Sequence, residues 1–136
     1  MSNTIKAMKI DVQKQSVYEI EIENTLEAKY KAIGNGCTLL QIACQFPHTV
    51  LTTKPRDVMY VDEDILMRTE SREEAYSIGA FKYAVPPTGI INPNHPIVNT
   101  IVGNAIIVGT DLEGNTTDHT QTVQSVMERI FGFIKY

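Results

Sequence analysis

Histidines and clustered carboxylates are the residues that most invite catalytic or metal chemistry in this chain, but their spacing fits no known motif. His48, His95 and His119 are isolated and lack the His-x-x-x-His or Cys-x-x-Cys spacing of a zinc site. Asp62–Asp64 is a run of acidic side chains of the kind that binds Ca²⁺ or Mg²⁺. It lacks the alternating acids, the glycine and the distant bidentate glutamate of a calcium loop, so we expect a solvated turn and no metal.

Nucleophile and phosphate-binding motifs are also missing from the sequence. It contains no Gly-x-Ser-x-Gly, no phosphate loop and no Gly-x-Gly-x-x-Gly. Cys37 and Cys44 point to opposite faces of one predicted strand, so we expect free thiols that fill the core. Paired-carboxylate hydrolysis stays open, because its acids need not be close in sequence. We expect a protein that is not an enzyme and uses no cofactor.

The segment Pro86–Pro96 is the strongest candidate for ligand recognition. Its prolines forbid a regular element and stiffen the chain, and its polar side chains are neutral donors and acceptors. Ordered loops on a rigid scaffold often carry binding groups. The alternative, a plain crossover linker between two strands, stays open. The ligand-binding residues that we predict are Asn92, Asn94, His95, Asn99, Arg56 and Tyr83.

Length and composition predict one ordinary globular domain over residues 1–136. The chain is 43% hydrophobic and 21% charged, with a formal net charge of −4. A dedicated nucleic-acid binder would carry a basic excess, so we expect no nucleic-acid partner. We find neither a signal peptide nor an apolar run long enough to span a membrane, which predicts a cytoplasmic protein with no membrane partner.

The first part of the chain predicts a β-hairpin followed by a short helix. Apolar and polar residues alternate over residues 8–13 and again over 18–23, which is the period of half-buried strands. The polar face of the second run consists of Glu19, Glu21 and Glu23, and we expect it to face water. Asn24 and Glu27 resemble a capping box, and Gly34 ends a helix of roughly ten residues. Its apolar stripe consists of Leu26, Tyr30 and Ile33.

The middle of the chain predicts further strands and one more short helix. We expect strands over Cys37–Phe46, Val58–Val61 and Phe81–Val85, and a loop over Lys54–Asp57. A second capping box begins a helix from Ser71 to Ser77, which ends at Gly79.

Ile101–Val108 is expected to be the central strand, because it is apolar on both faces except at Asn104. A buried Asn104 needs a hydrogen-bond partner, for which we favour a backbone group of the proline segment over a ligand. The flanks of a single strand would lie at opposite ends of it. They could then share one small pocket only if the loop folds back or a second subunit contributes.

The C-terminal residues predict an amphipathic helix that packs on the sheet. Val123, Val126, Met127, Ile130, Phe133 and Ile134 follow helical spacing, and Thr116–Asp118 offers N-caps. Phe131 falls off this stripe and suggests a homodimer contact. The fold class that we predict is α+β: a mixed or mostly antiparallel sheet with two or three helices, the C-terminal one on the sheet.

Several stretches resemble an uncharacterised family of small proteins carried mainly by bacteriophages, plasmids and their hosts. They are the hairpin ending in Ile-Glu-Asn-Thr-Leu-Glu-Ala, the helix end Ile33-Gly34 with the apolar strand after it, and above all Val102–Gly114 with the helix that follows. The Val61–Asp64 turn is similar to an Asn/Asp-Glu-x-Gly turn of that family, without its glycine. Residues 68–96 are longer than the family pattern. The resemblance spans most of the chain and carries no functional residue, but it implies an accessory protein of a mobile element, acting in the host cytoplasm.

Three functions are compatible with this setting. The first is a counter-defence sponge that binds and sequesters a small nucleotide-derived immune signal without chemistry; Tyr60 is a further aromatic candidate for its base. The alternative is a protein-binding inhibitor or adaptor that docks on a host enzyme through the glutamate row or an open sheet edge. The second alternative is a small nucleotide hydrolase.

Overall fold

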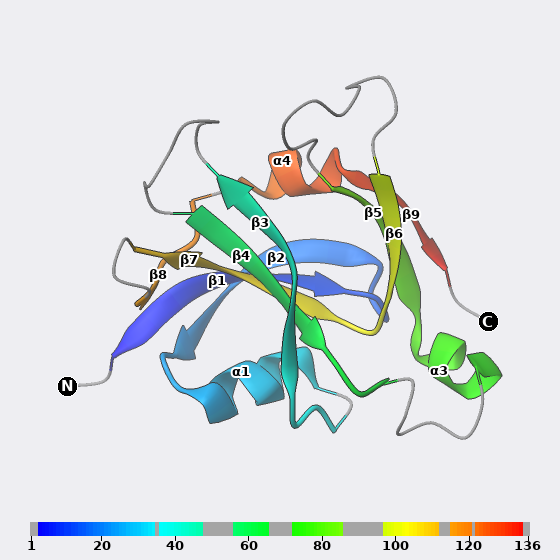
Figure 1. The fold of residues 1–136 in the computed structure, drawn as a ribbon, viewed down its shortest axis with the longest axis horizontal. Coiled ribbons are helices and arrows are strands. Elements are labelled where there is room, and N and C mark those ends of the chain that lie inside the picture. Colours follow the sequence, from blue (N-terminus) through cyan, green and yellow to red (C-terminus); the bar gives the residue numbers. More distant parts are fainter. Residues whose placement is uncertain are drawn as a thin grey trace.

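The computed structural model describes residues 3–34, 36–47, 56–65, 72–85, 97–111, 115–120 and 122–134, and most of them form antiparallel strands (Figure 1). A larger sheet has the order β2-β1-β7-β4-β3, with β8 beside β7, and a smaller sheet has the order β6-β5-β9. The strands are β1 (Thr4–Asp11), β2 (Ser16–Glu23), β3 (Leu40–Pro47), β4 (Arg56–Asp62), β5 (Ala80–Val85), β6 (Ile97–Val102), β7 (Ala105–Thr110), β8 (Thr116–Thr117) and β9 (Ile130–Ile134). The helices are α1 (Leu26–Ile33), α3 (Arg72–Ile78) and α4 (Val123–Met127).

The predicted α+β class is therefore confirmed at the level of antiparallel sheets with short helices. Both sheets are fully antiparallel in the strand pairs that the structure describes. Within the same residues, no helix is long and apolar enough to cross a membrane.

The N-terminal hairpin forms as the alternation predicts. β1 and β2 pair antiparallel from Thr4↔Glu23 to Asp11↔Ser16. The row Glu19, Glu21 and Glu23 is exposed, as expected. α1 follows and ends at Gly34, whose φ of 76° suits glycine. Its N-cap is Thr25, one residue after the predicted Asn24, and the Thr25 hydroxyl accepts the Ala28 amide. Leu26 is 54% exposed, so the buried stripe of α1 begins only at Tyr30.

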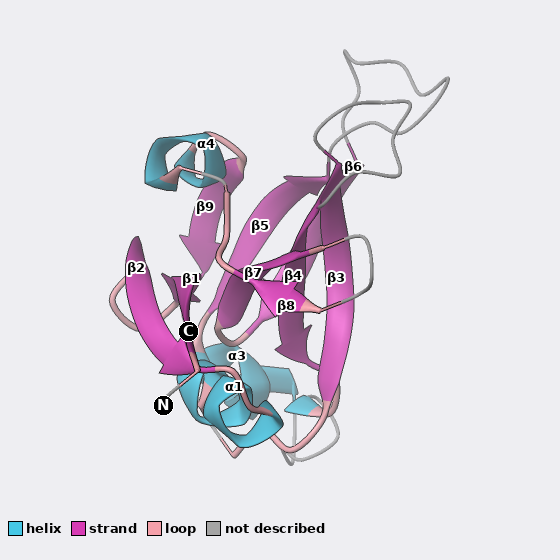
Figure 2. Ribbon diagram, turned by 90° about the vertical axis from the view of Figure 1, so that its left-hand side faces the viewer, coloured by secondary structure: helices cyan, strands magenta, loops and turns pink. Residues whose placement is uncertain are grey.

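The larger sheet is covered on both faces. Between the two sheets lies the main core, made of Met8, Ile10, Val12, Val17, Met59, Val61, Phe81, Tyr83, Ala105, Ile107 and Val126. On the opposite face, α1 covers a second cluster made of Ile5, Ala7, Ile33, Cys37, Ile106 and Val108. Neighbouring residues of β1 and β7 therefore belong to different cores, as period-two strands require. Figure 2 shows α1 and α4 at opposite ends of the molecule.

The single central strand predicted over Ile101–Val108 is wrong. The chain forms β6 in the smaller sheet, breaks at Gly103–Asn104, and continues as β7 in the middle of the larger sheet. Gly103 has a φ of +85°, and its amide donates to the Gly79 carbonyl at 2.8 Å. An apolar sequence on both faces does not reveal this change of sheet, because Ile101 and Val102 pack into different clusters and β7 is buried on both of its faces. Residues 101–108 do not form one strand, so the segments before and after them need not lie at opposite ends of a strand.

Asn104 is the polar group at this corner, and its role is structural. It is 4% exposed, its Oδ1 accepts the Val12 amide at 2.9 Å, and its Nδ2 donates to the Ile33 carbonyl at 2.9 Å. We expected a backbone group of the proline segment as the partner, but the two groups belong instead to the residue after β1 and to the last residue of α1. One side chain thus satisfies the last carbonyl of a helix and an amide just past a strand.

The predicted C-terminal helix is also wrong beyond Met127. α4 spans Val123–Met127 with Thr122 as its N-cap, and residues 130–134 form β9 against β5. Ile130, Phe133 and Ile134 fit helical spacing, but β-branched and aromatic residues also favour strands, and pairing with β5 decides between the two. Val126 packs into the main core. The side chain of Phe131 lies outside the described part, so its role in a dimer stays a prediction.

Two segments predicted outside strands form strands instead. Arg56 and Asp57, expected in a loop, begin β4 and pair with Thr110 and Gly109 of β7. Thr116 and Thr117, expected as helix caps, form β8.

We predict that Asn104→Ala lowers the free energy of unfolding by about 2–4 kcal/mol, because it leaves two buried backbone groups without their partners. Urea denaturation measures this change. Gln13→Ala, at an exposed turn position, is the control and should change stability by less than about 0.5 kcal/mol. An Asn104→Ala protein as stable as the wild type would refute the role given to this amide.

We predict that Gly103→Ala is destabilising by about 1–3 kcal/mol. The left-handed backbone disfavours any other residue, and a Cβ at this position would lie 2.7 Å from Cδ1 of Ile65. Gly132→Ala in β9 is the matched control, because its Cβ would meet nothing within 4 Å. Thermal unfolding of both variants should separate them clearly, and equal melting temperatures would contradict the prediction.

Candidate functional site

The structure distributes the predicted ligand-binding residues over several places. Asn92, Asn94 and His95 lie outside the described residues. Tyr83 and Asn99 are direct register partners in β5 and β6. Tyr83 is 1% exposed, and its ring meets Phe81 edge-on with centroids 6.3 Å apart, so it belongs to the core between the sheets. For Arg56 and Asn99 the structure describes the strand position and not the side chain.

Residues 86–96 connect the two strands of a hairpin. Val85 and Ile97 are register partners at the end of the β5–β6 pair, so this segment is not a crossover between distant strands. Arg56 begins β4 opposite Pro47 of β3, at the end of a second hairpin. Both hairpins open toward the same end of the molecule, at the top of Figure 1. Arg56 and the last residue pair of β5 and β6 therefore lie at a common end of the molecule, although on different sheets.

One row of paired residues runs from Arg56 across the larger sheet. Arg56 of β4 pairs with Thr110 of β7, and Thr110 pairs with Thr116 of β8. At a strand spacing of about 4.8 Å, the backbones of Arg56 and Thr116 are roughly 10 Å apart.

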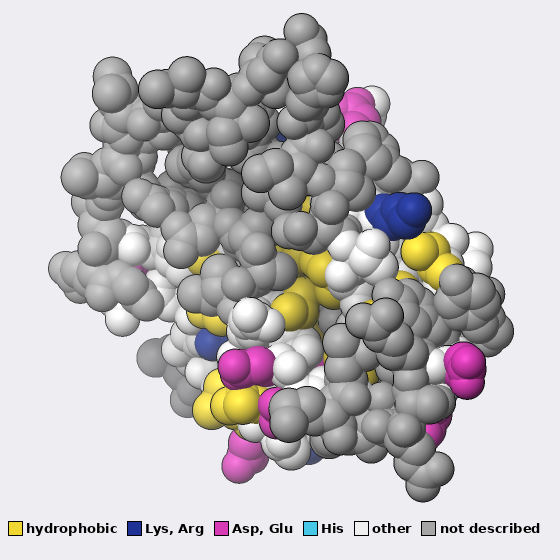
Figure 3. Space-filling view, turned by 45° about the vertical axis from the view of Figure 1, so that its right-hand side comes forward, with side chains coloured by type: hydrophobic (Ala, Val, Ile, Leu, Met, Phe, Trp, Pro, Cys, Tyr) yellow, Lys and Arg dark blue, Asp and Glu magenta, His cyan; other side chains and the backbone are white. Residues whose placement is uncertain are grey.

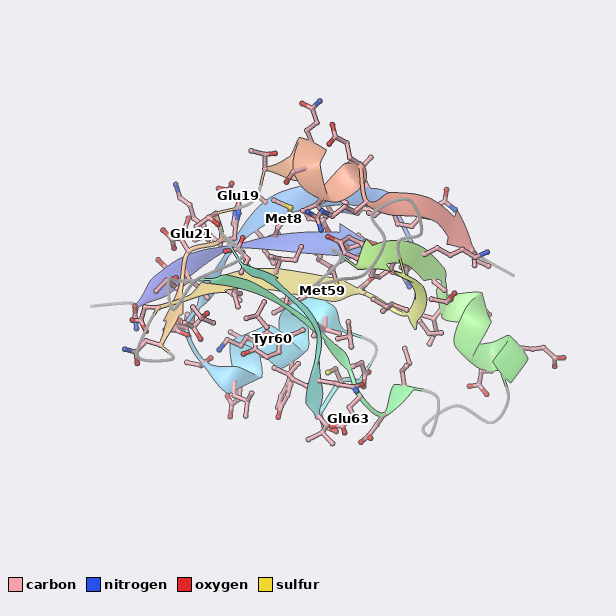
Figure 4. All side chains as sticks on the ribbon, turned by 45° about the horizontal axis from the view of Figure 1, so that its top comes forward. Met8, Glu19, Glu21, Met59, Tyr60 and Glu63 are labelled. Atoms are coloured by element: carbon pink, nitrogen blue, oxygen red, sulfur yellow. The ribbon has the colours of Figure 1, made fainter. Side chains whose placement is uncertain are left out.

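Lys29 reaches this row from α1. Its Nζ donates to the Thr116 hydroxyl at 3.2 Å and lies 5.9 Å from the centroid of the Tyr60 ring. Tyr60 packs against the cluster under α1, on the side of the larger sheet that faces away from the smaller one (Figure 4). Tyr60 was singled out from the sequence, but Lys29 was not. Only contacts between distant segments distinguish it from the other lysines.

Burial lowers the pKa of Lys29, because the ammonium group loses part of its hydration. Among the described residues, no carboxylate forms an ion pair with it. The ring of Tyr60 and the hydroxyl of Thr116 offset only part of that loss.

The acidic side chains of β2 lie on the opposite face of the larger sheet. Glu19 is opposite Met8, which belongs to the main core, and its Oε2 is 3.2 Å from Nε2 of His119. The His119 amide also donates to the Lys6 carbonyl at 2.9 Å. Among the described side chains visible in Figure 3, acidic groups gather at the lower left and at the right-hand edge of the view.

The buried carboxylate of Asp57 holds the segment that follows β8. It is 0% exposed and accepts the Thr120 amide at 2.8 Å and the Thr120 hydroxyl at 3.1 Å. The same segment crosses directly over Gly109, where a Cβ would collide with the Asp118 carbonyl. Asp118 also accepts the Lys6 amide at 2.8 Å. These contacts explain Asp57 as a structural clamp, which the sequence did not reveal.

One further acid, Asp62, is used by a turn. Asp62, in the predicted solvated turn, is 5% exposed and accepts the Asp64 amide at 3.1 Å. Within the described residues, no group of three or more His, Cys, Asp or Glu side chains could hold a metal ion.

A pocket of about 340 Å³ lies at the C-terminal end of α1. It is lined by Tyr30, Lys31, Gly34, Gly36 and Cys37. Cys37 forms no disulfide and is buried in the second core, as predicted, and its Sγ donates to the Leu39 carbonyl at 3.6 Å. The side chain of Cys44 lies outside the described part.

Comparisons with family models, with curated proteins and with solved structures find no match for this chain. The resemblance to phage-borne and plasmid-borne proteins therefore stays an expectation.

Asp11 and Tyr18 give the fold a pH-dependent contact at the β1–β2 turn. Burial alone would raise the pKa of Asp11, but hydrogen bonds from the Lys14 amide, the Tyr18 hydroxyl and the Gln13 amide, with the charge of Lys9, lower it below 3.8. The Tyr18 hydroxyl lies 2.8 Å from Asp11 Oδ2.

We predict that Tyr18→Phe lowers the free energy of unfolding by about 1–2 kcal/mol at neutral pH. A lowered folded-state pKa stabilises the fold above pH 3.8 and loses this effect as pH falls through the lowered value. The difference between wild type and Tyr18→Phe should therefore shrink below that pH in urea titrations. Tyr30→Phe on α1 is the control, and a pH-independent difference would refute the contact.

Proposed function

We propose that this protein binds and sequesters a small nucleotide-derived ligand without chemistry, as a counter-defence accessory protein of a mobile element. The observation that carries the proposal is the β5–β6 hairpin: residues 86–96 connect the register partners Val85 and Ile97, at the same end of the molecule as Arg56. Paired strands hold the two ends of such a connection about 5 Å apart. The buried rings of Phe81 and Tyr83 anchor β5 below it.

A nucleotide needs two kinds of contact, and residues at this end of the molecule can offer both. Arg56 supplies a cation for a phosphate, and Asn92, Asn94 and His95 supply neutral groups for the edges of a base and a ribose. The paired strands β5 and β6 fix where the polar segment begins and ends, and this lowers the conformational entropy that the protein loses on binding a ligand.

We predict saturable binding of at least one ligand in a calorimetric panel of cyclic nucleotides and ADP-ribose derivatives. Arg56→Ala should weaken that binding at least about tenfold, because one charged hydrogen-bond partner is worth roughly 1.5–3 kcal/mol. Lys31→Ala, an exposed lysine on α1, is the control and should bind like the wild type.

Mass spectrometry of the ligand after denaturation completes the experiment. Intact ligand supports sequestration, whereas a cleaved product would support the hydrolase. Absence of binding across the whole panel would overturn the proposed function.

A second candidate is a protein-binding inhibitor or adaptor that acts on a host enzyme. The observation that favours it is the exposed row Glu19, Glu21 and Glu23 on β2, which is an edge strand of the larger sheet. Such an edge can accept a further strand, and the glutamates would favour a basic one. Retention of one host protein by the wild type, and its loss with Glu21→Lys, would support this candidate over the first.

A further inference from the structure

Lys29 is a partly buried cation without a counter-ion in the described structure. Its ammonium group has three N–H donors, and the contacts described for it are the Thr116 hydroxyl at 3.2 Å and the Tyr60 ring at 5.9 Å. Lys29 also lies in the first half of α1, where the helix dipole adds positive potential. The charge is therefore compensated neither by a described carboxylate nor by the helix.

The groups around Lys29 are rich in hydrogen-bond donors. The Thr116 oxygen accepts from Lys29, so its own O–H remains available to donate. Asn24 also contacts Thr116: its Nδ2 donates to the Thr116 carbonyl at 3.4 Å, which leaves a second N–H on the same amide. Donor groups from three segments thus meet at Thr116, and the Tyr60 ring lies beside the Lys29 ammonium group.

We propose that Lys29, Thr116 and Asn24 form a site for a phosphate group. A tetrahedral oxyanion offers acceptors in several directions, which suits donors that arrive from α1, from β8 and from the residue before Thr25. A carboxylate is planar and suits the fork of an arginine better than the point charge of a lysine. The site needs neither residues 86–96 nor a nucleotide, because the phosphate group alone supplies the negative charge that no described carboxylate brings to Lys29.

A purely structural role for Lys29 is the competing explanation. The Lys29–Thr116 hydrogen bond joins residues that are 87 positions apart and ties α1 to β8. Loss of that tie would lower stability, but it would not make stability depend on phosphate. The two explanations therefore differ in the phosphate dependence of each variant and not in its stability without phosphate.

The experiment measures melting temperature against inorganic phosphate, with sodium chloride at matched ionic strength as the reference. A ligand that binds only the folded state raises the melting temperature saturably. We expect this rise for the wild type, at least a tenfold weaker apparent affinity for Lys29→Met, and an affinity within about threefold of the wild type for Lys29→Arg. Lys31→Met, on the same helix, is the matched control and should respond like the wild type.

Each variant is compared with itself without phosphate, so a loss of stability in Lys29→Met does not affect the result. Thr116→Val, which keeps the shape and removes the hydroxyl, should weaken the phosphate response at least threefold. A second titration with ribose 5-phosphate separates the sources of the group: equal affinity indicates free phosphate, and tighter binding indicates an ester. The proposal is overturned if phosphate acts no more strongly than chloride, or if Lys29→Met responds like the wild type. Neither outcome would affect the nucleotide panel read through Arg56→Ala.

Discussion

The fold depends on a single buried amide at the corner where the chain leaves one sheet for the other. Asn104 accepts from Val12 and donates to Ile33, so it joins the residue after β1 to the last residue of α1. Because Asn104 also begins the step into β7, the same contact fixes the central strand of the larger sheet. Removal of this amide would leave the Ile33 carbonyl of the covering helix and the Val12 amide after β1 buried and unpaired at once.

A second constraint follows from the position of β7. β1 pairs with β7 only from Met8 to Ile10, and Gly109–Thr110 pair with β8 instead, so β8 and the residues after it fill the space where β1 and β7 diverge. Asp57 holds that segment at Thr120. This clamp fixes Thr116 beside Lys29, so the candidate phosphate site rests on contacts that have no direct part in it.

The sequence predicts those parts of the fold in which local pattern and tertiary contact agree. The β1–β2 hairpin is correct because its alternation is regular and one face of β2 remains in water. The sequence prediction merges β6 and β7 because Ile101–Val108 is apolar on both faces apart from Asn104. Only the positive φ of Gly103 marks the break between the two strands. Residues 130–134 are misassigned because their apolar spacing satisfies two periods. Arg56 and Tyr60 could be chosen by residue type, but Lys29 acquires its role from Thr116, 87 residues away.

The charge distribution constrains how an anion could reach this protein. The chain carries a net charge of −4, and the row of glutamates on β2 lies on the opposite face of the larger sheet from Lys29. Long-range attraction of an anion is therefore weak, and charges more than about 8 Å apart are largely screened at physiological ionic strength. Affinity must come from short contacts with a cation that is already partly desolvated. Phosphate binding at such a site is favourable because the phosphate oxygens replace water contacts that Lys29 has already lost. A fully exposed lysine would first have to lose its own hydration, which costs free energy.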